Sequence, residues 1–191
     1  MTIVVPADPL AVKKLLPQVV AWDGPAYFRL CRNEVPEIFT DAYAPVIGKG
    51  ITLMDGDDAT VIACGIMVAR AIEAARQLAA QGVHLRVVEM HTIKPLDTDL
   101  IVRCAQETGA IVTAEEHSII GGLGGAVAEC LSQSAPVPLE RVGVNDTFTE
   151  SGPYNELLDK YGMSVEAIVA AAQRALKRKH ESPLQATSEV I

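Results

Sequence analysis

Three ionisable side chains stand next to one another at Glu115, Glu116 and His117, directly after a short apolar run. Two adjacent carboxylates can raise the pKa of one of them, and a histidine beside them can relay a proton, so the triplet suits general acid–base catalysis. The alternative is structural: one glutamate faces solvent, the other pairs across a subunit interface, and His117 caps the loop. Because the chain offers no evident substrate wall opposite these groups, the structural interpretation is favoured.

A glycine-rich turn follows the triplet, with the sequence GGLGG at residues 121–125. The N-terminus of a helix beyond such a turn can bind an anion. The turn lacks the lysine and the serine or threonine of a P-loop, and it does not match GxGxxG. Close packing of the next helix against the sheet is therefore the favoured explanation for these glycines.

Arginines occur near the end of another predicted strand. Arg29 and Arg32 lie in the segment YFRLCRNEVP, and Arg32 falls just past the strand, where a guanidinium can reach into a cleft. Its planar set of donors suits a phosphate monoester. On the residues alone, pairing of a surface arginine with Glu34 or Glu37 is favoured.

A third group of polar residues, His91, Thr92 and Lys94, follows the predicted strand at residues 83–89. The carboxyl ends of parallel strands are where ligands bind in α/β proteins. The favoured interpretation is nevertheless a loop that leads the chain into the next helix, with Pro95 stiffening its exit. The sequence contains no GxSxG, no HExxH and no nucleophile–base pair, so it indicates no self-contained active site.

Strands and helices alternate along most of the chain, which requires a mostly parallel sheet with right-handed crossovers. Strands are expected at residues 51–54, 60–64, 83–89, 109–114 and 139–144, and helices at 66–81, 97–106, 122–131, 153–161 and 165–176. The first strand is joined to the second by a tight turn and is expected to be antiparallel at an edge. We predict an α/β fold: a three-layer α/β/α domain with a mostly parallel five-stranded sheet at residues 44–177, followed by a flexible tail at 178–191.

Residues 1–43 show only a strand–helix–strand pattern. Strands are expected at 2–5 and 26–30, and Asp8 followed by Pro9 marks the start of a helix that runs to about Val20. Two strands and one helix cannot enclose a core. This block is therefore expected to be the end of a second α/β domain, and the proline- and glycine-rich residues 34–50 to be a linker.

Composition restricts the classes of partner. The net charge is −8 with no basic stripe, so no nucleic acid is expected to bind. Cys31, Cys64, Cys104 and Cys130 lack CxxC spacing and suit small apolar side chains in a reducing cytoplasm. No apolar run is long enough to span a bilayer, and no signal peptide precedes Pro6.

Four segments, taken in order, resemble the C-terminal part of a transketolase: GPAYFRLCRNEVP (24–36), EMHTIKPLD (89–97), VTAEEHSIIGGLGGAVAE (112–129) and FTESGPYNELLDKYGM (148–163). The resemblance is strongest to the split form, in which a separate chain carries the carboxyl half. The segments are also similar to the C-terminal parts of 1-deoxyxylulose-5-phosphate synthase and of the β subunits of 2-oxo acid dehydrogenases.

The resemblance implies that residues 1–43 are the terminal fragment of a pyrimidine-binding domain and residues 44–177 a transketolase C-terminal domain. The family's catalytic glutamate and its metal-binding motif belong to parts that do not match this chain. No catalytic, cofactor-binding or metal-ligating residue is therefore expected here, and thiamine diphosphate and Mg²⁺ are expected only in the complete enzyme. Arg32 matches the family arginine that holds the sugar phosphate, and the resemblance favours that role. Asn33 replaces the glutamine common in full-length transketolases, which leaves the substrate open.

The activity implied is transfer of a two-carbon ketol unit between sugar phosphates of the pentose phosphate pathway, with thiamine diphosphate as the electron sink. The expected partner is an N-terminal transketolase half or subunit, in a homo- or hetero-oligomer, and the chain alone is expected to be inactive. The alternative is a non-catalytic module for dimerisation or regulation.

Overall fold

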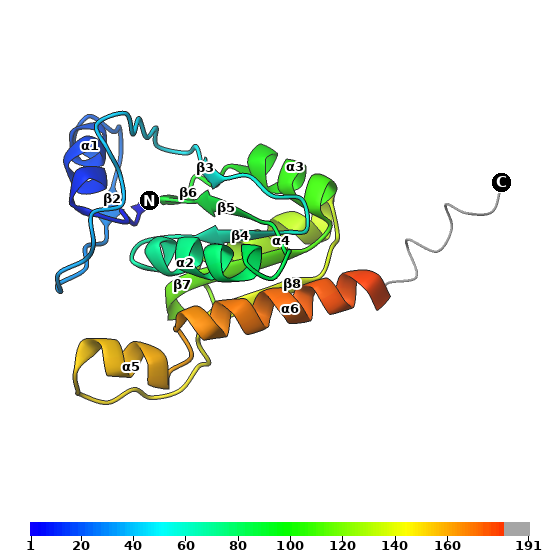
Figure 1. Cartoon of the computed structure of the whole chain (residues 1–191). Coiled ribbons are helices and arrows are strands. Elements are labelled where there is room, and N and C mark those ends of the chain that lie inside the picture. The colour runs from blue at the N-terminus through cyan, green and yellow to red at the C-terminus, as the bar shows by residue number, and fades with distance from the viewer. Residues whose placement is uncertain (182–191) are drawn as a thin grey trace.

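The computed structural model describes residues 1–181 and places a small sheet beside a larger one (Figure 1). The elements are β1 (Thr2–Val4), α1 (Pro9–Val20), β2 (Ala26–Phe28), β3 (Ile51–Met54), β4 (Ala59–Ala63), α2 (Met67–Ala79), β5 (Leu85–Glu89), β6 (Thr92–Lys94), α3 (Thr98–Thr108), β7 (Ile111–Ser118), α4 (Leu123–Ser134), β8 (Leu139–Val144), α5 (Tyr154–Lys160) and α6 (Val165–Glu181).

The larger sheet has five strands in the order β3-β5-β4-β7-β8. The pairs β4–β5, β4–β7 and β7–β8 are parallel, and β3 runs antiparallel to β5 at the edge. β4 is buried along its whole length, as its continuous apolar sequence predicts for a strand covered on both faces. The predicted mostly parallel five-stranded sheet with an antiparallel edge strand is confirmed.

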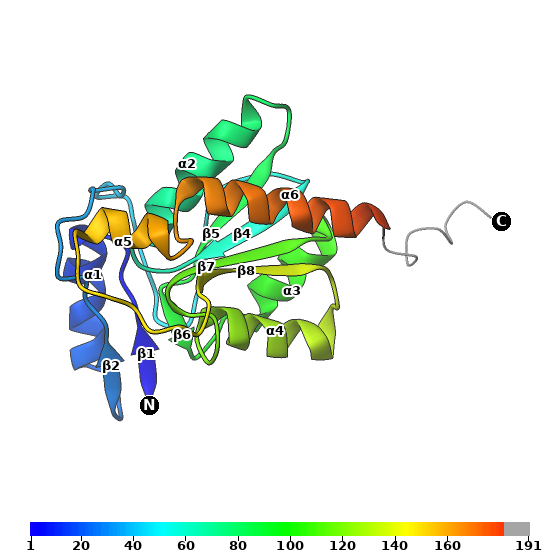
Figure 2. The same cartoon turned by 90° about the horizontal axis from the view of Figure 1, so that it is seen from below.

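Helices cover both faces of this sheet. α2 and α6 lie on one face, and α3 and α4 lie on the other, which Figure 2 shows most clearly. Small side chains allow α2 and α6 to approach the sheet closely; those fully buried include Ala71, Ala74, Ala171, Ala172 and Ala175. The three-layer α/β/α architecture is therefore confirmed.

The smaller sheet has the order β2-β1-β6, with β1 and β2 parallel and β6 antiparallel to β1. The prediction of a loop at residues 91–95 was wrong, because Thr92–Lys94 forms a strand. β1 would otherwise carry unpaired backbone groups at this edge, and β6 supplies their partners. The first block is thus joined to the rest of the chain by strand pairing.

The linker also packs as part of the first block. Tyr43 and Ile47 lie in one buried cluster with Val4, Ala11 and Leu15, so the strand–helix–strand unit completes a small core with residues that follow it. Asp8, at the start of α1, also connects the first block to the linker. Asp8 caps the helix by accepting the N–H of Ala11 at 2.7 Å, as predicted, and its other oxygen accepts two amides of the linker, from residues 38 and 39.

The last helix is longer than predicted. α6 continues to Glu181, beyond the expected end at Leu176, because Arg178 donates to the carbonyl of Leu139 and to the carboxylate of Glu140 and so ties the final turns to β8. Residues 182–191 of the predicted tail lie outside the described residues. In residues 1–181, no helix combines the length and apolar character needed to cross a membrane.

Candidate functional site

Glu116 joins the first block to the larger sheet. Arg29, just after β2, donates through Nη2 to the carbonyl oxygen of Glu116, and the same nitrogen lies 3.5 Å from the carboxylate. Tyr154, at the start of α5, donates its hydroxyl to Glu116 Oε1 at 2.9 Å, and Cys31 Sγ lies 3.3 Å from that hydroxyl. Burial, and then the hydrogen bonds with Cys31 and Glu116, raise the pKa of Tyr154, so the hydroxyl stays protonated. The partner of Arg29 is therefore Glu116.

Glu115 is buried and binds the N-terminus of α4. Its two carboxylate oxygens accept the N–H groups of Leu123 and Gly124, each at 2.7 Å. A carboxylate of the chain itself therefore occupies the position where a helix N-terminus attracts an anion. The close approach depends on Gly122, where a Cβ atom would lie 2.0 Å from Glu115 Oε2. Close packing is thus confirmed as the reason for this glycine.

The acid–base triplet is not assembled. Glu115 faces α4, Glu116 faces Arg29 and Tyr154, and the exposed His117 ring lies 2.9 Å from the carbonyl oxygen of Ser118. The contacts favour the structural interpretation, although neither glutamate simply faces solvent: both carboxylates bind groups of their own chain. The predicted pairing across a subunit interface stays a prediction. Alternation along β7 sends neighbouring side chains to opposite faces, which separates the two glutamates.

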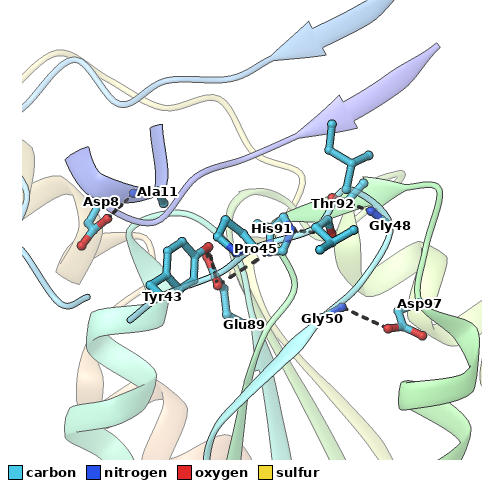
Figure 3. Close-up of polar contacts among 12 residues, drawn as sticks. Asp8, Ala11, Tyr43, Pro45, Gly48, Gly50, Glu89, His91, Thr92 and Asp97 are labelled. Atoms are coloured by element: carbon cyan, nitrogen blue, oxygen red, sulfur yellow. Dashed lines mark hydrogen bonds and ion pairs between the residues drawn. The ribbon is translucent and has the colours of Figure 1, made fainter. Parts of the chain in front are cut away.

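A buried polar cluster lies between the linker and the larger sheet (Figure 3). Glu89, at the end of β5, is fully buried, and the Tyr43 hydroxyl lies 2.8 and 3.0 Å from its two oxygens. His91 is also fully buried; its Nε2 lies 3.1 Å from the carbonyl oxygen of Val46, and its Nδ1 lies 3.7 Å from Glu89 Oε2. Burial, followed by the charge and hydrogen bond of Glu89, raises the pKa of Tyr43, which therefore donates its proton to the carboxylate.

Two neighbouring side chains hold the next part of the linker. Thr92 Oγ1 accepts the N–H of Gly48 at 3.1 Å, and Asp97 Oδ2 accepts the N–H of Gly50 at 3.1 Å. His91 and Thr92 thus bind backbone groups of the chain, whereas Lys94 is exposed. Sequence reasoning singled out His91 and Thr92 but missed Glu89 and Tyr43. An acidic residue at the end of an otherwise buried apolar strand was the available signal, since buried carboxylates need partners.

Arg32 follows β2 in a segment whose neighbouring residues line a cavity of the first block. This cavity, of about 500 Å³, opens where β1 and β2 end and is lined by Asp8, Cys31, Asn33 and Glu34 among others. Arg32 is exposed and stands in the chain between two of these lining residues. The parallel pair β1–β2 thus presents its carboxyl ends to the cavity, which is the usual place for a ligand.

The N-terminus of α4, beyond the glycine-rich turn, is filled by Glu115. Within residues 1–181, no three His, Cys, Asp or Glu side chains are grouped so that they could hold a metal ion.

These observations define the class of protein. It combines a three-layer α/β/α domain with a small strand–helix–strand unit, and buried polar contacts join the two. The family model described as "Transketolase, C-terminal domain" matches residues 48–168. The chain belongs to the transketolase C-terminal domain family.

Known proteins resemble the chain beyond that domain. It is 45% identical over 180 residues to the 6-deoxy-6-sulfo-D-fructose transketolase subunit of Clostridium sp. (strain MSTE9), covering 94% of this chain and 56% of the relative. It is 40% identical over 179 residues to a subunit of the apulose-4-phosphate transketolase of Phocaeicola vulgatus, covering 93% and 57%. A solved structure titled a split gene transketolase, inactive β4 tetramer, superposes with a TM-score of 0.91 at 49% identity, covering 94% and 59%. The chain thus spans a little more than half the length of these relatives.

Proposed function

We propose that the chain is the C-terminal part of a transketolase-type enzyme, which transfers a two-carbon ketol unit between sugar phosphates in the cytoplasm. The names of the relatives support this proposal, since both curated proteins above are subunits of transketolases. Free thiols at all four cysteines suit a reducing compartment. The pentose phosphate pathway is one source of such substrates. By their names, the two relatives act on other sugars. The donor and acceptor sugars of this chain's enzyme are therefore to be found by assay.

The observation that carries the proposal is the open side of the first block. Among the strands of residues 1–181, β2 is paired only with β1, and Tyr27 on this strand is half exposed. Further apolar side chains of the block are also exposed: Leu16 (46%), Val20 (79%), Trp22 (38%) and Leu30 (56%). An unpaired strand edge and exposed large apolar side chains are each typical of an interface. We infer that residues 1–43 are the end of a pyrimidine-binding domain, completed by an N-terminal transketolase half that brings thiamine diphosphate and Mg²⁺.

In this assembly Arg32 would bind the phosphate of the sugar. Its exposure and its place beside Asn33 at the cavity support this role. A remote phosphate clamp supplies binding energy that orients the ketose carbonyl toward the cofactor.

Reconstitution tests the proposal. The purified chain is mixed with an N-terminal transketolase subunit, thiamine diphosphate and Mg²⁺, and ketol transfer from several ketose phosphates is followed. We expect turnover by the mixture and none by the chain with cofactors alone. Turnover by the chain alone, or tight Mg²⁺-dependent binding of thiamine diphosphate to it in calorimetry, would contradict the proposal.

A non-catalytic module for self-association is the second candidate. It is favoured by the solved relative whose title describes an inactive β4 tetramer. Analytical ultracentrifugation of the chain with and without the N-terminal subunit separates the two candidates. A self-assembled oligomer that persists unchanged in the presence of that subunit would favour the second.

A further inference from the structure

The segment that carries Arg32 has few attachments to the rest of the chain. Residues 30–37 belong to no helix or strand. Before them, the backbone N–H of Arg29 donates to the carbonyl oxygen of the last residue of β1 at 2.9 Å. After them, Asp8 accepts the first two backbone amides beyond the segment. The segment is thus fastened at both ends, and Arg32 lies between the two attachments.

One hydrogen bond links the interior of this segment to the rest of residues 1–181. It joins Cys31 Sγ to the hydroxyl of Tyr154 on α5, at 3.3 Å. Tyr154 has one hydroxyl proton, which it donates to Glu116, so its oxygen accepts the S–H proton of Cys31. Cys31 immediately precedes Arg32 and also lines the cavity of the first block. The contact therefore acts on the backbone directly beside Arg32.

Tyr154 is suited to hold this thiol because it is itself held by the larger domain. Its side chain packs against the buried cluster between α2, α6 and the five-stranded sheet, and its hydroxyl is fixed by Glu116 of β7. The helix α5 is also tied to α2, since Arg70 donates to Asp159 at 2.9 Å and to the carbonyl oxygen of Met163 at 2.7 Å. The helix lies at the same end of the molecule as the first block (Figure 1), and it reaches that block from a fixed position.

We propose that Tyr154 is a positioning residue for Arg32: by holding the thiol of Cys31, it fixes the backbone from which the Arg32 side chain extends. This inference rests on the proposed function, in which Arg32 binds the phosphate of the sugar. Arg32 is exposed, so a segment that moved freely would let its guanidinium spread over many positions. Fixing the backbone beforehand lowers the entropy that is lost when the phosphate binds.

A positioning contact and a merely structural one predict different kinetics. Loss of stability would affect all substrates alike, whereas misplacement of Arg32 would weaken only the binding of phosphorylated sugars. Tyr154→Phe removes the hydroxyl and keeps the ring. In the reconstituted enzyme we expect it to raise KM for a phosphorylated ketose about three- to tenfold, which corresponds to the loss of one neutral hydrogen bond. We expect kcat, and KM for the unphosphorylated ketose, to change little.

Variants of Cys31 test the contact from its other side. Cys31→Ala removes the donor and should raise the same KM about as much as Tyr154→Phe, whereas Cys31→Ser keeps a donor and should restore most of the lost affinity. The double variant Cys31→Ala/Tyr154→Phe should be no worse than Tyr154→Phe alone, because both substitutions remove one shared interaction. Tyr161→Phe is the matched control: this tyrosine at the end of α5 has no hydroxyl hydrogen bond within residues 1–181, and its loss should have no effect. Additive increases in KM would overturn the proposal.

Backbone nitrogen relaxation of the full chain tests the positioning without an enzyme assay. In the wild type we expect the order parameter of the Arg32 amide to be near the rigid value of about 0.85, and in Tyr154→Phe and Cys31→Ala to fall to about 0.6 or below. The amide of Val61, inside β4, should be unchanged in all of them. An order parameter of the Arg32 amide that does not respond to either substitution would overturn the positioning role.

The two measurements separate failure of this inference from failure of the proposed function. If Arg32→Ala raises KM selectively for the phosphorylated ketose and Tyr154→Phe does not, the positioning role is wrong and the proposed function stands. If Arg32→Ala has no selective effect, the phosphate-binding role of Arg32 is wrong and the inference falls with it. The order parameter then still decides whether Tyr154 holds the segment.

Discussion

The carboxylate of Glu115 accepts the backbone N–H of Leu123 at 2.7 Å, so the end of β7 and the start of α4 are held together by a charge-assisted contact. Gly124 donates to the other oxygen of the same carboxylate. The glycine-rich turn thus bends the chain back until a strand residue caps the following helix. The glycine-rich turn suggested a site for a bound anion, but the Glu115 carboxylate of the chain itself occupies that position.

Gly122→Ala should destabilise the fold by about 2–4 kcal/mol, since the new methyl group would overlap the Glu115 carboxylate and break its bonds to α4. Gly125→Ala is the matched control, because a Cβ atom there would meet no atom within 4 Å. It should stabilise α4 by about 0.5–1 kcal/mol. Urea unfolding measures both changes, and equal effects of the two substitutions would contradict this packing.

Arg32→Ala in the reconstituted enzyme should raise KM for a phosphorylated ketose by about 10- to 100-fold, the equivalent of losing a charged hydrogen-bonding partner. KM for the unphosphorylated ketose should change little. Arg103→Ala, at an exposed position of α3, serves as the control for loss of one positive charge. Equal increases for both sugars would rule out a phosphate clamp at Arg32.

Glu140 should contribute to the acid sensitivity of the fold. Burial tends to raise the pKa of this carboxyl, but hydrogen bonds from Arg178 and Arg174 outweigh burial and lower it. A lowered native pKa means that the stabilisation is present above the unfolded value, about 4.3, and is lost as pH falls through the native one. Glu140→Gln should therefore cost about 0.5–1 kcal/mol at pH 7 and nothing in strong acid.

Thermal unfolding from pH 2 to 7 measures this difference. Glu73→Gln is the control, because Glu73 forms a more exposed pair with Arg76 at 3.8 Å. It should leave the pH dependence nearly unchanged. If the unfolding temperature of Glu140→Gln differs from that of the wild type by the same amount at every pH, the two arginines do not act through this carboxylate.

The cysteines should differ in reactivity toward iodoacetamide. Cys64 and Cys104 are fully buried, and burial raises the pKa of both thiols, so they should react only after unfolding. Cys130 is partly exposed, but burial and Asp99 raise its pKa, which should make it slow. Cys31, partly exposed beside the cavity, should react first. Peptide mass spectrometry of timed samples gives the order, and early labelling of Cys64 would contradict its buried position directly after β4.

The sequence by itself determined the order and type of most elements. Asp8 with Pro9 predicted the start of α1, and β8 was predicted with its observed bounds at Leu139–Val144. These signals are local: a capping side chain, or an apolar run of strand length, acts within a few residues. The five-stranded sheet follows from their alternation, because parallel strands need helical crossovers on both faces.

Only the tertiary structure decided which polar groups meet. Tyr43 and Glu89 are 46 positions apart, and Arg29 and Glu116 are 87 apart, so no periodicity or motif connects them. The same holds for Thr92–Lys94, which becomes a strand because β1 has a free edge there. Buried polar groups take whatever partners the packed chain brings within reach, and those partners are fixed by the fold as a whole.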